Sequence, residues 1–392
     1  MTAIELLHHA APWWAAYALA ASACFYLGVS LRTWTVALGL LVAGLVNFSE
    51  GPRWSEWLAF GSWALPAFLF GIPWLRRALV SRPMLAFYRS AMPELSATER
   101  EALDAGGTWF DAELFSGRPD FSVLLDLPQP SLSPAEREFL DGPTEQLCAM
   151  LDDHAITEEL EDLPPVAWDF IKRQGFLGMV IPTAHGGKGF SQHGHAAVIM
   201  KIATKSISAA LDVMIPNSVG PGKLLVKYGT DAQQQRWLPR LASGQELPCF
   251  ALTGPEAGSD AGAMTDIGTV CRQDGVLGLR LDFDKRYITL APAATVLGLA
   301  FKLRDPDGLL DDATGPGGER RIERGITIAL VPASTPGVSL GTRHKPLHMA
   351  FLNGPVRGRG VFVPLDAVIG GPPMIGCGWR MLMECLTDGR AI

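Results

Sequence analysis

Residues 12–75 carry almost no charge, and this constrains the fold more than any other feature of the chain. Only Arg32, Glu50, Arg53 and Glu56 interrupt the stretch. It divides into three apolar runs, 12–31, 33–49 and 57–75, each close to the roughly 20 residues with which a helix crosses a bilayer. A removed signal peptide does not fit, because the first run lacks a basic start and apolar sequence continues far beyond it. We therefore expect residues 1–80 to be a membrane-associated helical leader.

Arginines at the end of the leader predict its orientation. Arg76, Arg77 and Arg82 follow the last run, and the positive-inside rule then places the rest of the chain in the cytoplasm. The number of spans stays open. Only Arg32 separates the first two runs, which is too tight for two spans and a turn, so a re-entrant or interfacial segment is an alternative. A buried helical hairpin in a soluble domain is another.

Size, charge and cysteines narrow the class of protein. A chain of 392 residues with 48% hydrophobic content can hold two or three domains with sizeable cores. The net charge of −7 and the absence of a basic stripe in the sequence argue against a nucleic-acid partner. The six cysteines form no CxxC pair and no metal-ligand spacing, which indicates reduced thiols.

After the leader, the sequence passes from a proline-rich stretch to one with the hydrophobic periodicity of helices. Residues 81–135 are rich in proline and predict a linker that wraps the next domain, with one helix at 96–105 opened by the capping-box spacing of Ser96 and Glu99. Residues 136–247 have a helical period and form a predicted helical domain. Its expected helices include 165–174, 196–212, 222–228 and 231–242.

From residue 248 to 375, β-branched and apolar runs bounded by Gly, Pro and Asp predict a β domain. Its expected strands are 276–281, 295–303, 325–331 and 360–363, with an exposed insertion at 305–324. Residues 376–392 then begin a helix.

A loop of small residues just after an apolar run is the main candidate for a binding site. Residues 251–263 read Ala-Leu-Thr-Gly-Pro-Glu-Ala-Gly-Ser-Asp-Ala-Gly-Ala, so backbone N–H groups there could approach a phosphate without obstruction. A second stretch, residues 285–291, places Tyr287 and Thr289 two apart, where they would share one face of a strand. Taken singly, the loop is as consistent with a surface turn, and the strand with an ordinary strand pair.

Together the two stretches resemble the flavin-binding part of the acyl-CoA dehydrogenase family. The family pattern reads Ala-Leu-Thr-Glu-Pro-x-Ala-Gly-Ser-Asp, followed by Lys-x-aromatic-Ile-Thr, and this chain departs from it at Gly254, where Glu is usual. Four segments of the helical region, 185–191, 216–221, 228–231 and 237–244, also resemble the family in order and spacing. The layout of leader, linker and core resembles large bacterial membrane-associated members.

The resemblance implies an α+β fold: apolar membrane-associated helices, an N-terminal helical domain, a middle β-barrel-like domain and a truncated C-terminal helical bundle. It implies FAD as cofactor. Thr253 would bind the pyrimidine edge of the flavin, Thr289 its hydride-accepting nitrogen, and Tyr287 would cover the ring. Ser259 would lie by the phosphates and the CoA arm of the substrate, and Gly258 would let the backbone come close. The implied cofactor-binding residues are Phe250, Leu252, Thr253, Gly258, Ser259, Tyr287, Ile288 and Thr289.

The family reaction is the α,β-dehydrogenation of fatty acyl-CoA to trans-2-enoyl-CoA, with an electron-transfer flavoprotein as acceptor. Its general base is normally a Glu of the C-terminal bundle, and no residue of this chain matches that position, so we assign no catalytic residue and expect the base beyond Ile392. Glu256 and Glu384 are the carboxylates that could be considered, but nothing in the sequence indicates that either faces the thioester. We expect an inactive N-terminal part of a longer enzyme at the bacterial inner membrane, facing the cytoplasm and homo-oligomeric at full length.

Three alternatives to this interpretation remain. The chain could be a non-catalytic, membrane-tethered module that binds flavin or acyl-CoA, or a flavin monooxygenase of the same fold. The third concerns metal. His185, His193 and His195 invite a metal site, but no Cys or carboxylate completes a ligand set near them, so we expect no metal and interpret them as polar loop and helix-start residues.

Overall fold

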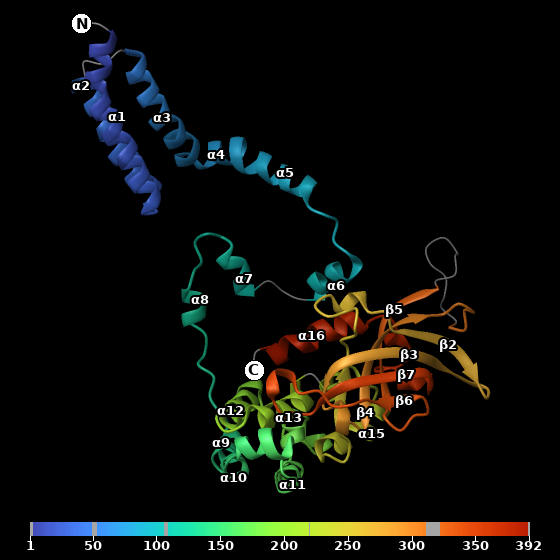
Figure 1. Cartoon of the computed structure of the whole chain (residues 1–392). Coiled ribbons are helices and arrows are strands. Elements are labelled where there is room, and N and C mark those ends of the chain that lie inside the picture. Colours follow the sequence, from blue (N-terminus) through green and yellow to red (C-terminus); the bar gives the residue numbers. More distant parts are fainter. Residues whose placement is uncertain (1–2, 49–52, 106–108, 219, 311–321, 391–392) are drawn as a thin grey trace. The chain divides into compact units, whose positions relative to one another are not determined.

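The structure is a computed structural model that describes residues 3–48, 53–105, 109–218, 220–310 and 322–390 (Figure 1). Its contacts divide the chain into two compact units, with the division between Leu95 and Ser96. That division lies inside the linker expected at 81–135. The finer domain boundaries stay predictions.

The first unit begins with three helices, α1 (Ala3–Tyr26), α2 (Leu31–Phe48) and α3 (Arg53–Gly71). Helix α2 packs on both neighbours and buries Leu38, Val42 and Leu45. The expected crowding between the first two apolar runs is resolved, because α1 ends at Tyr26 and the chain turns before α2 begins. Gly28, at φ 60°, lies in that turn, in the left-handed region that glycine enters without strain.

Helix α2 is, among the described residues, the one helix that is long and apolar enough by itself to cross a membrane. A second candidate is α3 taken together with residues Pro73–Ala91, a pair bent by 87°. The bent part consists of α4 (Pro73–Arg76), a π-helical turn (Arg77–Ser81) and α5 (Arg82–Ala91). Membrane association of the leader stays a prediction.

The second unit opens with short helices, α6 (Ala97–Ala105), α7 (Trp109–Leu114) and α8 (Ser122–Leu125). The capping box predicted at the start of α6 is confirmed. The Ser96 N–H donates to Glu99 Oε2 over 2.8 Å, and the Glu99 N–H donates to Ser96 Oγ over 3.2 Å. Helix α6 packs against the last helix, α16 (Gly378–Arg390), where the Trp379 ring N–H donates to the Thr98 carbonyl over 2.9 Å.

The predicted helical domain is present. Its helices are α9 (Pro134–Asp141), α10 (Pro143–Met150), α11 (Pro165–Gln174), α12 (Gln192–Ala203), α13 (Ile207–Ser218), α14 (Pro221–Tyr228) and α15 (Asp231–Ala242). The single helix expected at 196–212 is wrong, because two helices meet there. Thr204 Oγ1 donates to the Lys201 carbonyl over 2.7 Å at the end of α12, and Ser206 Oγ accepts from the Ala209 N–H over 3.3 Å at the start of α13. Such local side-chain bonds compete with a continuous helix.

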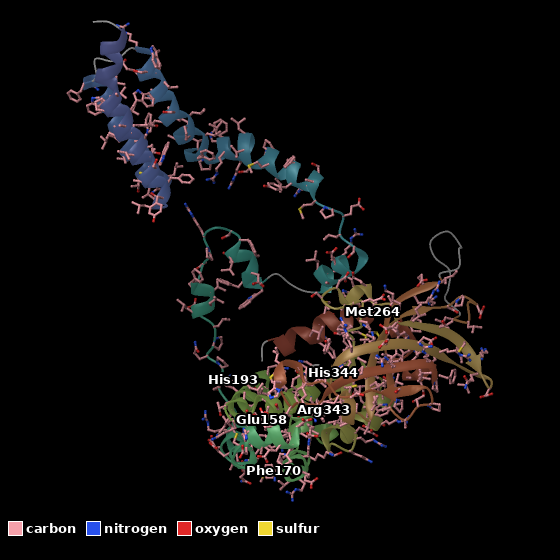
Figure 2. The ribbon with its side chains drawn as sticks, viewed as in Figure 1. Glu158, Phe170, His193, Met264, Arg343 and His344 are labelled. Carbon is pink, nitrogen blue, oxygen red and sulfur yellow. The ribbon has the colours of Figure 1, made fainter. Side chains whose placement is uncertain are left out.

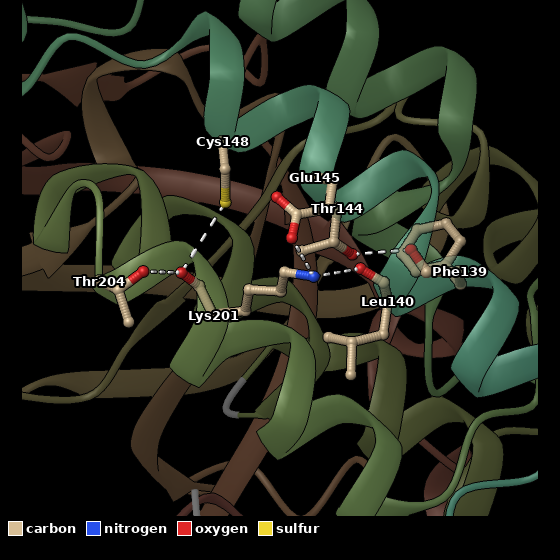
Figure 3. Close-up of polar contacts among 7 residues, drawn as sticks. All are labelled: Phe139, Leu140, Thr144, Glu145, Cys148, Lys201 and Thr204. Carbon is tan, nitrogen blue, oxygen red and sulfur yellow. Dashed lines mark hydrogen bonds and ion pairs between the residues drawn. The ribbon is translucent and has the colours of Figure 1, made fainter.

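Lys201 joins three helices of this domain (Figure 3). Its ammonium group lies 2.7 Å from Glu145 Oε1 on α10 and donates to the Leu140 carbonyl on α9 over 2.9 Å. The Lys201 carbonyl in turn accepts from the Cys148 thiol over 3.8 Å. One residue of α12 therefore fixes the position of the α9–α10 hairpin.

The β-barrel-like domain that the sequence predicts is a curled mixed sheet (Figure 1). Its strands are β1 (Pro248–Ala251), β2 (Ile267–Gln273), β3 (Val276–Thr289), β4 (Val296–Arg304), β5 (Glu323–Pro332), β6 (Val338–Leu340) and β7 (Asn353–Pro364). The order is β1-β4-β2-β3-β7-β6, and β5 pairs with β4. Each of the four expected strands overlaps one of these, and β3 and β7 are much longer than the strands expected at 276–281 and 360–363. The long β3–β7 ladder carries the candidate site at one end.

The insertion expected at 305–324 is exposed only in part. Asp305 is fully buried, and its carboxylate accepts hydrogen bonds from the Leu309 and Leu310 N–H groups, over 2.9 and 3.1 Å. Residues 311–321 lie outside the described residues.

Candidate functional site

A buried lysine fixes the small-residue loop to the sheet. Lys285, on β3, has no solvent exposure, and its ammonium group donates to the Leu252 carbonyl over 2.8 Å and to Asp266 Oδ2 over 2.5 Å. Asp266 Oδ1 also accepts from the Asp284 N–H over 2.9 Å. Burial lowers the pKa of Lys285, and Asp266 opposes that shift. Both ends of the loop are therefore tied to one position on β3.

A backbone bond then brings the two predicted stretches together. The Arg286 N–H donates to the Thr253 carbonyl over 3.0 Å. Because a strand advances about 3.3 Å per residue, this bond places Thr253 within roughly 10 Å of Thr289 along the strand. The side chains of both threonines are half-buried. The sequence predicted that the loop and the strand converge, and the structure brings them together.

A β-bulge determines which side chains of β3 face outward here. The β3–β7 register shifts between Lys285 and Ile288, and Tyr287 has a φ of 55°. Before the shift Lys285 faces the core, and after it Ile288 does, so Tyr287 and Thr289 both come to the less buried face. Bulges commonly re-aim side chains in this way. The common face predicted for Tyr287 and Thr289 thus depends on the bulge as well as on strand alternation.

The segment 341–353, called the crossing loop below, completes the neighbourhood. His344 of the crossing loop is labelled in Figure 2. The centroid of its ring lies 5.2 Å from the centroid of the Tyr287 ring. The Asn353 amide donates to Thr289 Oγ1 over 3.4 Å, and the Leu290 N–H donates to the Leu352 carbonyl over 2.7 Å. The crossing loop therefore touches both residues of the predicted aromatic and hydroxyl pair.

The helical domain holds the crossing loop from its other side. Asp212 Oδ1 on α13 accepts from the Leu352 N–H over 3.1 Å, and Ser208 Oγ accepts from the Ala350 N–H over 3.0 Å. Asp212 is fully buried and its Oδ2 has no hydrogen-bond partner among the described residues. Burial raises the pKa of Asp212 well above its ordinary value, which favours the neutral form of this carboxyl group.

Two polar side-chain contacts add a second connection between the crossing loop and the helical domain. His348 Nε2 lies 2.9 Å from Glu158 Oε1, and Lys345 pairs with Glu161. These four side chains are exposed or partly so. We expect them to contribute little to stability, as surface pairs do.

The remaining predicted residues lie in different surroundings. Phe250 is 7% exposed and Ile288 is 3% exposed, and both belong to core clusters. Leu252 is half-buried and offers its carbonyl to Lys285. Gly258 and Ser259 are exposed, and a Cβ at Gly258 would meet no atom of the chain within 4 Å. The side chains of Phe250 and Ile288 thus serve the core, whereas the loop tip is open to a ligand.

Glycine at position 254 suits the packing around the small-residue loop. A Cβ at this position would lie 3.3 Å from the Asp284 carbonyl and 3.9 Å from Asp266 Oδ2. A carboxylate there would add negative charge beside the buried pair of Asp266 and Lys285. A side chain at position 254 would therefore lie close to the Asp284 carbonyl beside this anchor.

Sequence reasoning missed His344, Asn353 and Asp212. The crossing loop follows the strand pair by more than fifty residues and carries no periodic signal. Asp212 offered one clue: it is an acid inside an otherwise apolar helical run, where a charged residue is rarely buried without a partner.

The structure also places the two carboxylates that the sequence raised as possible bases, Glu256 and Glu384. Glu384 on α16 pairs with Lys227 and accepts a hydrogen bond from the Tyr228 hydroxyl. Lys227, followed by Tyr228, lowers the pKa of Glu384, which makes this carboxylate a weaker base. Glu256 is exposed at the turn of the loop.

Two other features lie apart from this site. His195 lies near the start of α12, as expected, but it is fully buried there, and neither ring nitrogen has a hydrogen-bond partner among the described residues. No group of three or more His, Cys, Asp or Glu side chains suited to a metal gathers in the described part of the chain. A cavity of about 440 Å³ between α15 and the ends of β5 and β7 contains none of the predicted residues.

Comparisons with known proteins agree with this architecture. Residues 133–245 match the family model described as acyl-CoA dehydrogenase, N-terminal domain. Butyryl-CoA dehydrogenase from Megasphaera elsdenii superposes with a TM-score of 0.55 at 22% identity, over 67% of this chain and 64% of that one. The acyl-CoA dehydrogenase of Bacillus anthracis complexed with FAD has a TM-score of 0.53 at 22% identity, over 66% of this chain and 41% of that one. At these identities the solved structures show the fold alone: that of the acyl-CoA dehydrogenases.

Curated relatives extend the likeness to the sequence. The human very long-chain specific acyl-CoA dehydrogenase is 26% identical over 76% of this chain and 44% of its own length. Protein HemX of Proteus mirabilis is 56% identical over 24% of this chain and 50% of its own length. The chain spans half or less of the length of these relatives. The family model, the acyl-CoA dehydrogenase relatives and the solved structures together support the acyl-CoA dehydrogenase family for this chain.

Proposed function

We propose that this chain binds FAD and a fatty acyl-CoA at the end of the β3–β7 ladder, as part of an enzyme that dehydrogenates the thioester between its α and β carbons. The observation that carries the proposal is the bond from the Arg286 N–H to the Thr253 carbonyl. It brings the small-residue loop to the strand that bears Tyr287 and Thr289, and relatives with this fold bind FAD.

The residues present fit a flavin. Two half-buried hydroxyls, Thr253 and Thr289, lie on elements that the buried Lys285 holds in place. Tyr287 is 56% exposed beside His344, so its ring can cover a planar group. Next to Thr289, the buried Oδ1 of Asn353 has no partner among the described residues, which leaves an acceptor available at the same place.

When bound, FAD would supply the acceptor for the hydride that leaves the β carbon. The two threonines would hold and orient the cofactor by hydrogen bonds, and Ser259, with the open backbone at Gly258, would take the phosphates. Loss of the α proton requires a general base. We assign that role to none of the described residues, since Glu384 is already bonded to Lys227 and Tyr228.

Titration of FAD with the purified chain tests the binding proposal through quenching of flavin fluorescence. We expect Thr253→Ala/Thr289→Ala to weaken binding at least tenfold, because two hydrogen bonds to the cofactor contribute about 1 kcal/mol each. Thr269→Ala/Thr335→Ala is the matched control, since both residues are half-buried elsewhere in the β domain. Equal affinity for the two double variants would contradict the proposal, and so would a wild-type chain that does not bind FAD.

The second candidate function is binding without turnover, and the engagement of Glu384 favours it for residues 1–392 taken alone. Long-chain acyl-CoA added to the FAD-loaded chain separates the two functions. Bleaching of the flavin absorbance band would show dehydrogenation. Bound substrate with an unchanged band would show binding alone.

We further propose that the leader anchors the chain at the bacterial inner membrane, with the dehydrogenase part facing the cytoplasm. The apolar helix α2 and the arginines that follow α3 support this arrangement. We propose an electron-transfer flavoprotein as acceptor and a homo-oligomeric assembly. Protease added to inverted inner-membrane vesicles should remove residues 96–392, whereas intact spheroplasts should protect them; the opposite pattern would overturn the orientation.

A further inference from the structure

The helical stretch 73–92, called the bent arm below, is covered by nothing in its own unit. None of the residues of α4, the π-helical turn or α5 is buried. Its large apolar side chains are strongly exposed: Trp74 69%, Leu79 61%, Met84 51%, Leu85 50%, Phe87 67%, Tyr88 56% and Met92 64%. Short helices are marginal in water without packing, and apolar patches of this extent mark an interaction surface.

The charges of the bent arm indicate which kind of partner surface would match it. Its charged residues are Arg76, Arg77, Arg82 and Arg89, and no Asp or Glu lies between residues 57 and 93. The whole chain has a net charge of −7, so this segment is a local concentration of positive charge. A partner that matches it must be anionic and apolar at once, as the surface of a bilayer with acidic lipids is.

The two properties are segregated around α5. Arg82 and Arg89 are seven residues apart, which is two helical turns, so they share one side. On the same helical projection Met84, Phe87 and Tyr88 lie on the other side. A helix with a basic face and an aromatic and aliphatic face lies in the plane of a membrane interface, with its apolar face among the acyl chains.

The geometry of the leader supplies the orientation. Helix α3 and the bent arm meet at a bend of 87°. Helix α3 meets the length and hydropathy criterion for a span only together with the bent arm. With α3 inside a bilayer, this bend turns the bent arm along the membrane surface. A continuous span through the bent arm would instead place four arginines in hydrocarbon, which is strongly unfavourable.

We infer that residues 73–92 form an interfacial helix that binds anionic lipid, with Arg82 and Arg89 on the headgroup phosphates and Met84, Phe87 and Tyr88 in the outer acyl region. This inference rests on the proposed membrane location of the leader. It adds a lipid class and a binding surface to that proposal.

Hydrogen exchange of the full chain tests the inference. The chain is placed in nanodiscs of phosphatidylcholine alone and in nanodiscs with one quarter phosphatidylglycerol, and amide exchange in residues 82–92 is followed by mass spectrometry. Each arginine near an acidic leaflet strengthens binding about fivefold. We expect at least about fivefold slower exchange in the acidic discs, and a smaller difference at high salt.

The variant Arg82→Gln/Arg89→Gln should lose the difference between the two discs. Its matched control is Arg272→Gln/Arg280→Gln, which removes the same charge from exposed residues of the β2–β3 hairpin and should keep the difference. Equal exchange in both discs, or a control that behaves like the test variant, would overturn the inference. Protection that appears only in native membranes with their proteins would also overturn it, by pointing to a protein partner.

The same data separate this inference from the membrane proposal. Amides of α2 that exchange freely in every disc would refute the membrane location itself. Protected amides in α2 together with freely exchanging amides in residues 82–92 would leave the membrane location standing and refute the interfacial helix alone.

Discussion

At the scale of single residues, Lys285 is the side chain on which the candidate site most depends. It is fully buried, and it joins the Leu252 carbonyl to the Asp266 carboxylate. Removing one partner of a buried ion pair leaves the other charge uncompensated, which costs far more than the pair contributes. The anchor is therefore asymmetric: losing both charges is better tolerated than losing one.

We expect Lys285→Met to lower the free energy of unfolding by about 3 kcal/mol, because it leaves the buried Asp266 carboxylate without a cationic partner. Urea unfolding followed by circular dichroism measures this. The double variant Lys285→Met/Asp266→Asn should recover part of the loss. Arg304→Met is the control, since its pair with Glu323 is exposed and should change stability by less than about 1 kcal/mol. A Lys285→Met chain as stable as wild type would refute the anchoring role.

His195 gives a prediction of the opposite kind, because it opposes folding at low pH. Burial, and then the charge of Lys223, lowers the pKa of His195 to about 4. In the unfolded chain this imidazole takes up a proton below about pH 6.5, whereas in the folded chain it does so only below about pH 4. Stability that is present above pH 6.5 is therefore lost as the pH falls from 6.5 toward 4.

His195→Leu should remove that loss. Relative to wild type, we expect the variant to gain about 2 kcal/mol of unfolding free energy on going from pH 8 to pH 5. Urea unfolding at the two pH values checks the difference, and the exposed His193, changed to Leu, is the control. A wild-type and a variant chain with parallel pH dependence would show that His195 titrates normally.

At the scale of elements, the start of α9 is fixed by Glu136, which also reaches α12. Its carboxylate accepts from the Ser133 N–H over 2.8 Å and from the Ser191 N–H and hydroxyl, each over 2.6 Å. Burial by itself raises the pKa of Glu136, but the hydrogen bonds from Ser191 and Ser133 outweigh it and bring the pKa to about 2. One carboxylate thus joins the beginnings of two helices.

We expect Glu136→Gln to lower the free energy of unfolding by roughly 2 kcal/mol at pH 7, because the folded state stabilises the charged form of the Glu136 carboxylate more than the unfolded state does. This contribution is present above pH 4.5 and is lost as the pH falls through about 2. The gap between wild type and variant should accordingly narrow in acid. Glu138→Gln, an exposed change on the same helix, is the control, and a gap that stays constant with pH would contradict the assignment.

Some helices, strands and loops could be predicted from the sequence alone, and others could not. The loop and strand of the site could be predicted, because short motifs mark them and a buried lysine joins them locally. The break between α12 and α13 could not, since the apolar pattern continues past Ser206 into Ile207. The crossing loop was missed for a different reason: its contacts with Tyr287 and Thr289 are long-range. The bulge before Ile288 follows from the pairing of β3 with β7, which no local pattern reveals.

At the scale of the whole molecule, the two units have separate hydrophobic cores. The core around Leu38, Val42 and Leu45 draws on the leader alone, and the other two clusters draw on residues beyond 138. A chain of residues 96–392 should therefore keep its fold without the leader. We expect cooperative thermal unfolding by circular dichroism, near the transition of the same part in the full chain. A molten or aggregated product would show that the leader is needed for folding.

The contact between α6 and α16 has a consequence for biosynthesis. The Trp379 ring N–H donates to a carbonyl 281 residues earlier, so the contact between α6 and α16 forms only after α16 has been synthesised. By then residues 1–95 have long been translated. On the proposed membrane location of the leader, insertion can therefore precede the docking of α16.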